Sequence, residues 1–133
     1  ASFGAEAARY GLDQPLPEAQ QQARLALQAE AHCNALPDSM LPVMVDLQRM
    51  RDALLAQAAL QALEQTGGPG VVITGNGHAR GDWGAPVLLR RAAPDAVVVA
   101  LGQGEAGQPP DGTFDLILDA PAVQRSDPCD AFR

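Results

Sequence analysis

A glycine-rich loop carries the densest group of reactive side chains in this sequence. Between positions 75 and 86, four glycines surround an imidazole, a guanidinium, a carboxylate and the only tryptophan of the chain. These four side chains are His78, Arg80, Asp82 and Trp83. Ligands of α/β proteins bind in loops at the carboxyl ends of parallel strands, and this loop follows a run of β-branched residues. The pattern indicates a binding site; the structural alternative is a glycine-rich turn in which His78 and Asp82 hydrogen-bond to the backbone.

A second group of polar residues falls on one face of a long predicted helix. Gln48, Arg51 and Asp52 recur at the three- and four-residue spacing that places side chains on one face. Buried and turned toward the glycine-rich loop, they would add a carboxylate and an amide to the site. The spacing alone favours a solvated face with an ordinary Arg51–Asp52 pair. His32 follows the end of another predicted helix, where the helix dipole favours an imidazolium.

The elements that must position these residues are predicted from periodicity, capping and β-branched runs. Helices are expected over residues 19–31, from about 39 or 42 to 65 and, for one or two turns, over 86–91. Strands are expected over 71–74, 96–101 and 114–118. The order predicts an α/β fold with a small, mostly parallel sheet of about three strands and one long helix. The strand over 71–74 reads as a buried parallel strand. A sheet this thin indicates that residues 1–133 are a single domain or part of a larger one, or complete their core by association.

Composition and charge exclude several classes of function. Nine arginines, no lysine and sixteen acidic residues give a net charge of −7, and no basic stripe exists to bind nucleic acid. No segment approaches the roughly 20 apolar residues that a membrane span requires. The glycine spacing matches neither GxxxxGK[ST] nor GxGxxG, which argues against a phosphate-binding loop. The chain starts without Met, as a mature or trimmed end does.

The two cysteines are far apart and form no CxxC pair, which argues against a structural zinc site. Cys33 and Cys129 could therefore form one disulfide or remain two buried thiols.

Several of these segments together resemble the ChaN-like haem-binding uptake family of the Tiki superfamily. The segments that carry the resemblance are His32-Cys33, Leu36-Pro37, Met44, Gln48-x-x-Arg51-Asp52-Ala53, Gly75-Asn76-Gly77-His78-Ala79-Arg80, Gly84-x-Pro86 and Asp127-Pro128-Cys129. The resemblance extends over residues 25–131. The first Gly-Glu-x-His motif of the family has no counterpart here, so the chain would correspond to the C-terminal portion of a ChaN-like domain.

The resemblance implies a haem-binding protein of iron or haem uptake or trafficking, more a binding protein than an enzyme. It implies an extracytoplasmic location, periplasmic or at the outer membrane, a lipid anchor on a removed N-terminus, and two protomers that pair when haem binds. The implied disulfide joins Cys33 to Cys129, because both lie in family-like motifs and the implied compartment is oxidising.

The same resemblance implies a set of haem-binding residues. His78 would ligate the iron directly or hydrogen-bond to a tyrosine ligand, for which Tyr10 is the only candidate. Arg80 would pair with a propionate. The remaining expected contacts are Gly75, Gly77, Gln48 and Asp52, with an apolar slot formed by Met40, Val43, Met44, Leu47 and Trp83. The wider superfamily implies an alternative, a metal-dependent hydrolase in which His78, Asp52 and Asp82 hold a metal that activates water.

Overall fold

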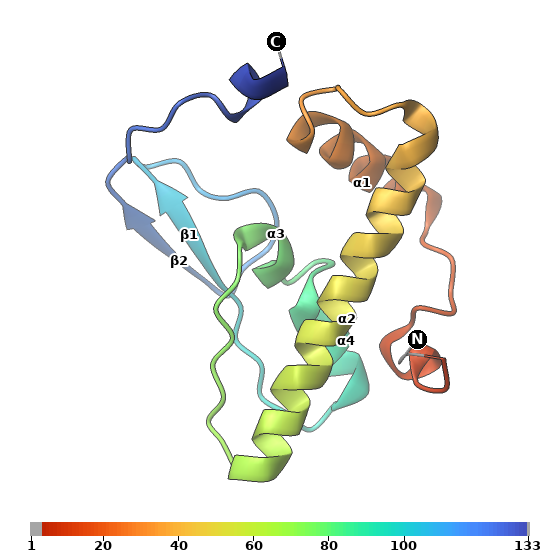
Figure 1. The fold of residues 1–133 in the computed structure, drawn as a ribbon. Helices are drawn as coiled ribbons and strands as arrows, with labels where there is room; N and C mark the ends of the chain where they lie inside the picture. The colour runs from red at the N-terminus through yellow and green to blue at the C-terminus, as the bar shows by residue number, and fades with distance from the viewer. Residues whose placement is uncertain (1–3, 133) are drawn as a thin grey trace.

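A computed structural model describes residues 4–132 as an α/β structure in which a long helix stands between other helices and a small sheet (Figure 1). In chain order the elements are η1 Ala7–Tyr10, α1 Glu18–Ala31, η2 Asp38–Met40, α2 Leu41–Thr66, α3 Asn76–Ala79, α4 Ala85–Ala92, β1 Leu101–Glu105, β2 Leu116–Ala120 and η3 Pro128–Phe132. The predicted fold class is confirmed. No helix within residues 4–132 is both long enough and apolar enough to cross a bilayer.

The helices begin and end where local chemistry predicts. Helix α2 runs for 26 residues and stops at Gly67, whose φ of 77° places it in the left-handed region that favours glycine. The Gly67 N–H donates to the Leu63 carbonyl at 2.9 Å, which satisfies one carbonyl of the last turn. A proline in the first turn of both α2 and α4 fits the same logic, since its missing N–H has no partner there.

The hydrophobic core lies on one face of α2. Val45, Ala53, Ala56 and Leu60 are buried on this face, at 6% exposure or less. Tyr10 from η1, only 1% exposed, packs with Ala53 and Ala56, and side chains of α4 surround this cluster. The core therefore belongs to the helices, and η1, α2 and α4 all contribute to it.

The sheet is smaller than predicted. Strands β1 and β2 pair in parallel, with Leu101 opposite Leu116 and Glu105 opposite Ala120. The expected strands over 96–101 and 114–118 correspond to these two, each displaced toward the C-terminus. The expected buried strand over 71–74 is wrong: the segment is assigned to no strand, and Val71 and Ile73 are 85% and 94% exposed. Within residues 4–132 no neighbouring strand pairs with this segment and no layer covers it.

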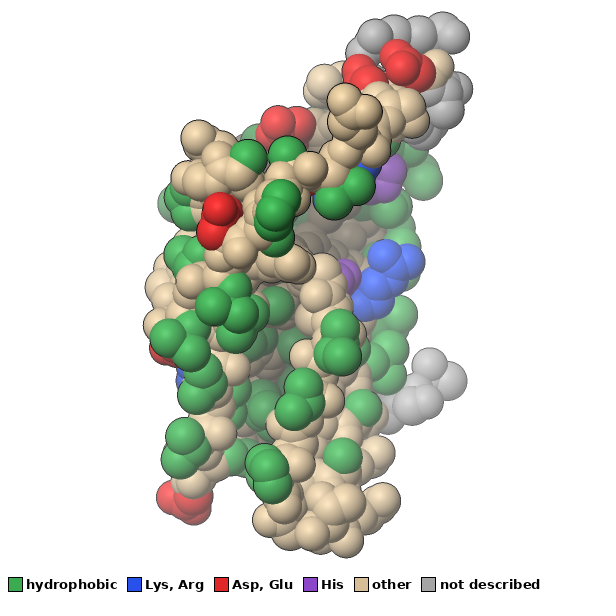
Figure 2. Space-filling model, turned by 90° about the vertical axis from the view of Figure 1, so that its left-hand side faces the viewer, with side chains coloured by type: hydrophobic (Ala, Val, Ile, Leu, Met, Phe, Trp, Pro, Cys, Tyr) green, Lys and Arg blue, Asp and Glu red, His purple; other side chains and the backbone are tan. Residues whose placement is uncertain are grey.

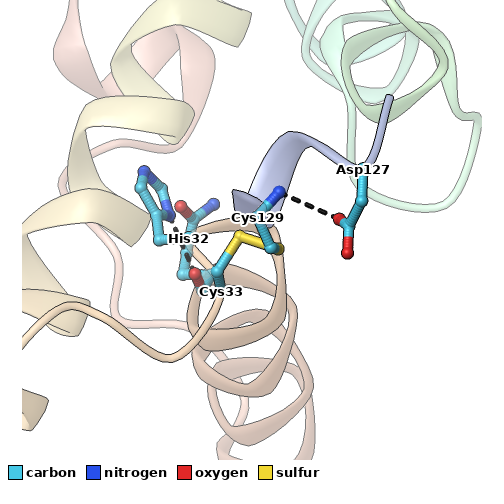
Figure 3. Close-up of a disulfide and its surroundings, with 5 residues drawn as sticks. His32, Cys33, Asp127 and Cys129 are labelled. Carbon is cyan, nitrogen blue, oxygen red and sulfur yellow. Dashed lines mark hydrogen bonds between the residues drawn. A yellow bond between two sulfur atoms is a disulfide. The ribbon is translucent and has the colours of Figure 1, made fainter. Parts of the chain in front are cut away.

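A disulfide ties the C-terminal tail to the end of α1 (Figure 3). Cys33 and Cys129 are bonded, with their Cα atoms 5.5 Å apart, so the pairing expected from the resemblance is present. Asp127 accepts a hydrogen bond from the Cys129 N–H at 2.9 Å and shapes the turn that presents the cysteine. The segment after β2 thereby returns to the helical side of the molecule.

Candidate functional site

The centre of the site is a hydrogen-bonded pair formed by two residues from separate elements. His78 lies on α3, a single helical turn, and its Nδ1 is 2.6 Å from Oδ1 of Asp52 on α2. Asp52 is fully buried, whereas the His78 side chain keeps 26% exposure. Asp52 follows Val45 by seven residues and precedes Ala56 by four, which places it within the buried face of α2. The interpretation of this position as part of a solvated stripe is therefore wrong.

Burial governs the electrostatics of the pair. It raises the pKa of Asp52 to about 6, against the hydrogen bond and charge of His78 and the charge of Arg24, which lower it. Asp52 Oδ2 has no hydrogen-bond partner within residues 4–132. Above this pKa the carboxylate accepts the Nδ1 proton of His78, and this tautomer leaves a lone pair on Nε2. The pair therefore presents a basic ring nitrogen whose orientation is set by a buried charge.

Gln48 and Met44 extend the site along α2, one and two turns before Asp52. Gln48 Oε1 accepts a hydrogen bond from Gln28 Nε2 at 2.7 Å, which links α2 to α1. A Cβ on Gly77 would lie 3.8 Å from Gln48 Nε2, so α3 packs against this turn of α2. Met44 is half-buried on the same side. Open space surrounds Gly75, so the chain itself requires no close approach there.

An apolar row begins at the end of η2 and continues along the face of α2 opposite its buried face. Its members recur at spacings of three and four residues and are 36% to 50% exposed: Met40, Val43, Leu47, Met50 and Leu54. Three of them belong to the apolar slot expected from the resemblance. The structure thus brings Met40, Val43 and Leu47 onto one exposed face and places Met44 between that row and the α3 contact.

Arg80 and Trp83 have internal partners. Arg80 is 7% exposed and donates from Nε and Nη2 to the two carboxylate oxygens of Asp82, at 2.6 and 2.7 Å. Its guanidinium lies 3.6 Å from the centre of the Trp83 ring, over which Arg24 also lies, at 5.1 Å. The hydrogen bonds from Arg80 hold the pKa of Asp82 below its ordinary value. These contacts hold the glycine-rich loop together, and they leave the Arg80 guanidinium buried and bonded internally, while the indole of Trp83 is partly buried.

Tyr10 lies on the core side of Asp52. It lines a cavity of about 200 Å³, together with Asp52, Arg24 and Trp83, and His78 is not among the residues that line it. Burial raises the pKa of Tyr10, which favours the neutral phenol. The structure therefore does not bring Tyr10 to the exposed side of His78.

His32 is separate from this pair. Its Nδ1 is 2.8 Å from the Gln28 carbonyl oxygen, and it occupies the end of α1, as its sequence position predicts. The residues proposed for a hydrolytic metal site do not form a cluster. Within residues 4–132 no group of three or more His, Cys, Asp or Glu side chains could hold a metal ion.

Comparison with models of protein families assigns the chain to a family. The sequence model described as "Haem-binding uptake, Tiki superfamily, ChaN" matches residues 1–89. The chain belongs to this family. The match includes both Asp52 and His78 and begins earlier than the resemblance over residues 25–131. It lies in the N-terminal part of the chain and does not extend over β1 and β2, which corrects the expected span. No curated protein and no solved structure gives a match.

Proposed function

We propose that this ChaN-family chain binds haem, and that His78 ligates the iron through Nε2 while Asp52 positions the imidazole. The main support for this proposal is the 2.6 Å contact between His78 Nδ1 and the buried Asp52 carboxylate. Histidines that ligate metals donate their other ring N–H to a carboxylate or carbonyl, which fixes the tautomer and raises the basicity of the ligand. Histidine is a common axial ligand of haem iron. The His78 imidazole and the Asp52 carboxylate behind it therefore fit haem iron.

The second requirement is apolar surface for a flat macrocycle. On the His78 side of α2 it is supplied by the half-buried Met44, and Met40, Val43 and Leu47 continue the apolar surface onto the exposed face opposite Asp52. Exposed apolar rows of this kind are typical of binding surfaces rather than of solvated helix faces. Haem, when bound, would supply an iron centre that takes a nitrogen ligand. The chain supplies the imidazole, the carboxylate that orients it and an apolar helix face.

The physiological role that we propose is haem uptake or trafficking in an extracytoplasmic compartment. The Cys33–Cys129 disulfide supports an oxidising location. Pairing of two protomers around haem and a lipid anchor outside the described residues belong to the same proposal. They are tested by sedimentation of the haemin-loaded protein and by fractionation of cells that express it.

The experiment that tests the haem site is a haemin titration followed through the Soret band. We expect His78→Ala to shift the band and weaken binding by about a hundredfold or more, since the iron loses its nitrogen ligand. His32→Ala is the matched control, because it removes the other histidine of the chain. Circular dichroism checks that both variants are folded. An unchanged band and affinity in His78→Ala would contradict the assignment, and Tyr10→Phe tests the alternative ligand.

A further inference from the structure

One edge of β1 is open, and the hydrogen bonds of its neighbours show which edge it is. Both backbone groups of Gln103 bond to the side chain of Asn76: the Gln103 N–H donates to Oδ1 at 3.0 Å, and its carbonyl accepts from Nδ2 at 2.8 Å. The N–H and C=O of one strand residue point to the same side, and this side alternates along the strand. Ala100 bonds in the other direction, to both the side chain and the backbone of Asp115. Residues 97, 99 and 101 therefore face the side on which Asn76 lies.

The two extended segments that lead into this region lack backbone partners. Val97 and Val99 make no hydrogen bond through N–H or C=O within residues 4–132, and the same is true of every residue of 71–74. Both segments are rich in β-branched residues, and alternate side chains turn outward: Val97 is 95% and Ile73 94% exposed. Both segments thus combine a sequence that favours strands with a backbone that has no hydrogen-bond partner within the described residues.

Figure 2 looks onto these segments from the left-hand side of Figure 1. It shows two ridges that carry apolar side chains, with a hollow between them. One ridge is the segment that follows α2 and the other is the segment that leads into β1. Asn76 joins the two at one end of the hollow through its bonds to Gln103.

We infer that an apolar β-strand, contributed by polypeptide outside residues 1–133, docks between residues 71–74 and residues 97–101. A strand fits because its backbone can form hydrogen bonds with the unpaired N–H and C=O groups of both walls, as in recognition by strand addition. It would be apolar, because both walls carry exposed apolar side chains, among them Val71, Ile73 and Val97. The inference is independent of the haem proposal.

A second copy of the chain is a poorer occupant. The apolar, strand-forming segments within residues 4–132 are 71–74, 96–101 and 116–120. The first two form the walls of the hollow and the third contains β2. Donating any of them would dismantle the docking site or the sheet of the donor.

Hydrogen exchange of the full chain tests the inference residue by residue. The probe is the acetylated and amidated peptide RVIVVTR, whose apolar centre suits the hollow and whose basic ends keep it soluble. We expect the amides of Val97, Val99 and Leu101 to gain about tenfold protection or more, as do those of 71–74 that face the peptide. The amides of Val98 and Ala100 point away and should change little. The same peptide with N-methylated alternate residues keeps its side chains, loses its donors and should not protect.

Three outcomes would overturn the inference. Absence of protection at saturating peptide would show that the hollow takes no strand. If the N-methylated peptide protected equally, or if protection did not alternate between odd and even residues, the peptide would cover the apolar side chains without pairing as a strand. Protection that grows with protein concentration in the absence of peptide, together with dimer mass in sedimentation, would assign the surface to a second copy.

Discussion

The helical and strand regions of this molecule contain similarly apolar sequence but bury it to different extents. On α2, Val45 and Ala53 are fully buried and Leu60 is 6% exposed. In the strand region, the small side chain of Ala100 is the one buried hydrophobic residue within the described residues, while Leu116 and Leu118 stay more than half exposed. A helix satisfies its own backbone hydrogen bonds and needs cover only along one stripe, which η1 and α4 provide for α2. A strand needs partners on two edges and layers on two faces, and β1 has a strand partner on one edge only within the described residues.

The family match follows the same division. It covers residues 1–89, which contain α1, α2, α3 and the start of α4, and stops before β1. The Asp52–His78 pair lies inside the matched part. The comparison thus separates a region with its own buried core from one whose apolar side chains are mostly exposed, and five predictions probe the two regions.

The largest effect is expected from the covalent link between the two regions. The disulfide closes a loop with a sequence separation of 96 residues. Replacing it with Cys33→Ser and Cys129→Ser should lower the free energy of unfolding by about 4 kcal/mol in the chain-entropy model, because the denatured chain gains freedom. Urea unfolding measures this, and the native protein in reductant is the control. Equal stability of variant and native protein would show that the tail contributes no constraint.

The next effect compares one residue from each region. Leu60→Ala should cost about 3 kcal/mol, since it opens a cavity in the helical core. Val97→Ala should cost less than about 0.5 kcal/mol, since the side chain is 95% exposed. The difference in denaturation midpoint between these variants measures the contrast. A cost for Val97→Ala near that of Leu60→Ala would mean that the strand face is covered in solution.

A pair of glycines tests the packing of the loop that presents His78. A Cβ on Gly84 would collide with the backbone of His78 and Arg80, whereas one on Gly75 would meet nothing within 4 Å. We expect Gly84→Ala to cost about 2 kcal/mol through overpacking, and Gly75→Ala to be tolerated. Thermal unfolding of both variants compares them directly. Destabilisation by Gly75→Ala alone would contradict the packing described here.

The smallest effect concerns pH and the buried carboxyl. At pH 7.5 native protein should bind haemin about tenfold tighter than Asp52→Asn, because only the carboxylate raises the basicity of His78. At pH 5, below the Asp52 pKa of about 6, this ratio should fall toward one. A ratio that does not change with pH would show that ionisation of Asp52 has no effect on haemin binding.

Folding stability should respond to Asp52 in the opposite direction. Its pKa is raised from 3.8 to about 6 by burial, so the native state holds the proton more tightly than the unfolded state. This contribution to the free energy of unfolding is fully present below pH 3.8 and is lost as the pH rises through about 6. Native protein should therefore gain stability relative to Asp52→Asn as the pH falls from 7 to 4.

Local sequence determined the helices, the loop and the family. Glycine at position 67, proline in the first helical turns and three- to four-residue periodicity act through neighbours in the chain, so α1, α2 and α4 were predictable to within a few residues, whereas the single turn α3 was not predicted. The concentration of functional groups around His78 needed no structure to be noticed. Two cysteines in family-like motifs were enough to expect their pairing.

Only the tertiary structure decided which polar residues meet and which strands are covered. Spacing placed Asp52 on a polar stripe, but the packing of α1, α3 and α4 around α2 buried it against His78. Arg80 had the charge for a propionate, yet Asp82 and Trp83 hold it inside. The run over 71–74 has the composition of a buried strand, but burial of a strand depends on neighbours that its own residues do not specify. Helix formation depends on contacts three and four residues away, whereas these outcomes depend on contacts with distant parts of the chain or beyond it.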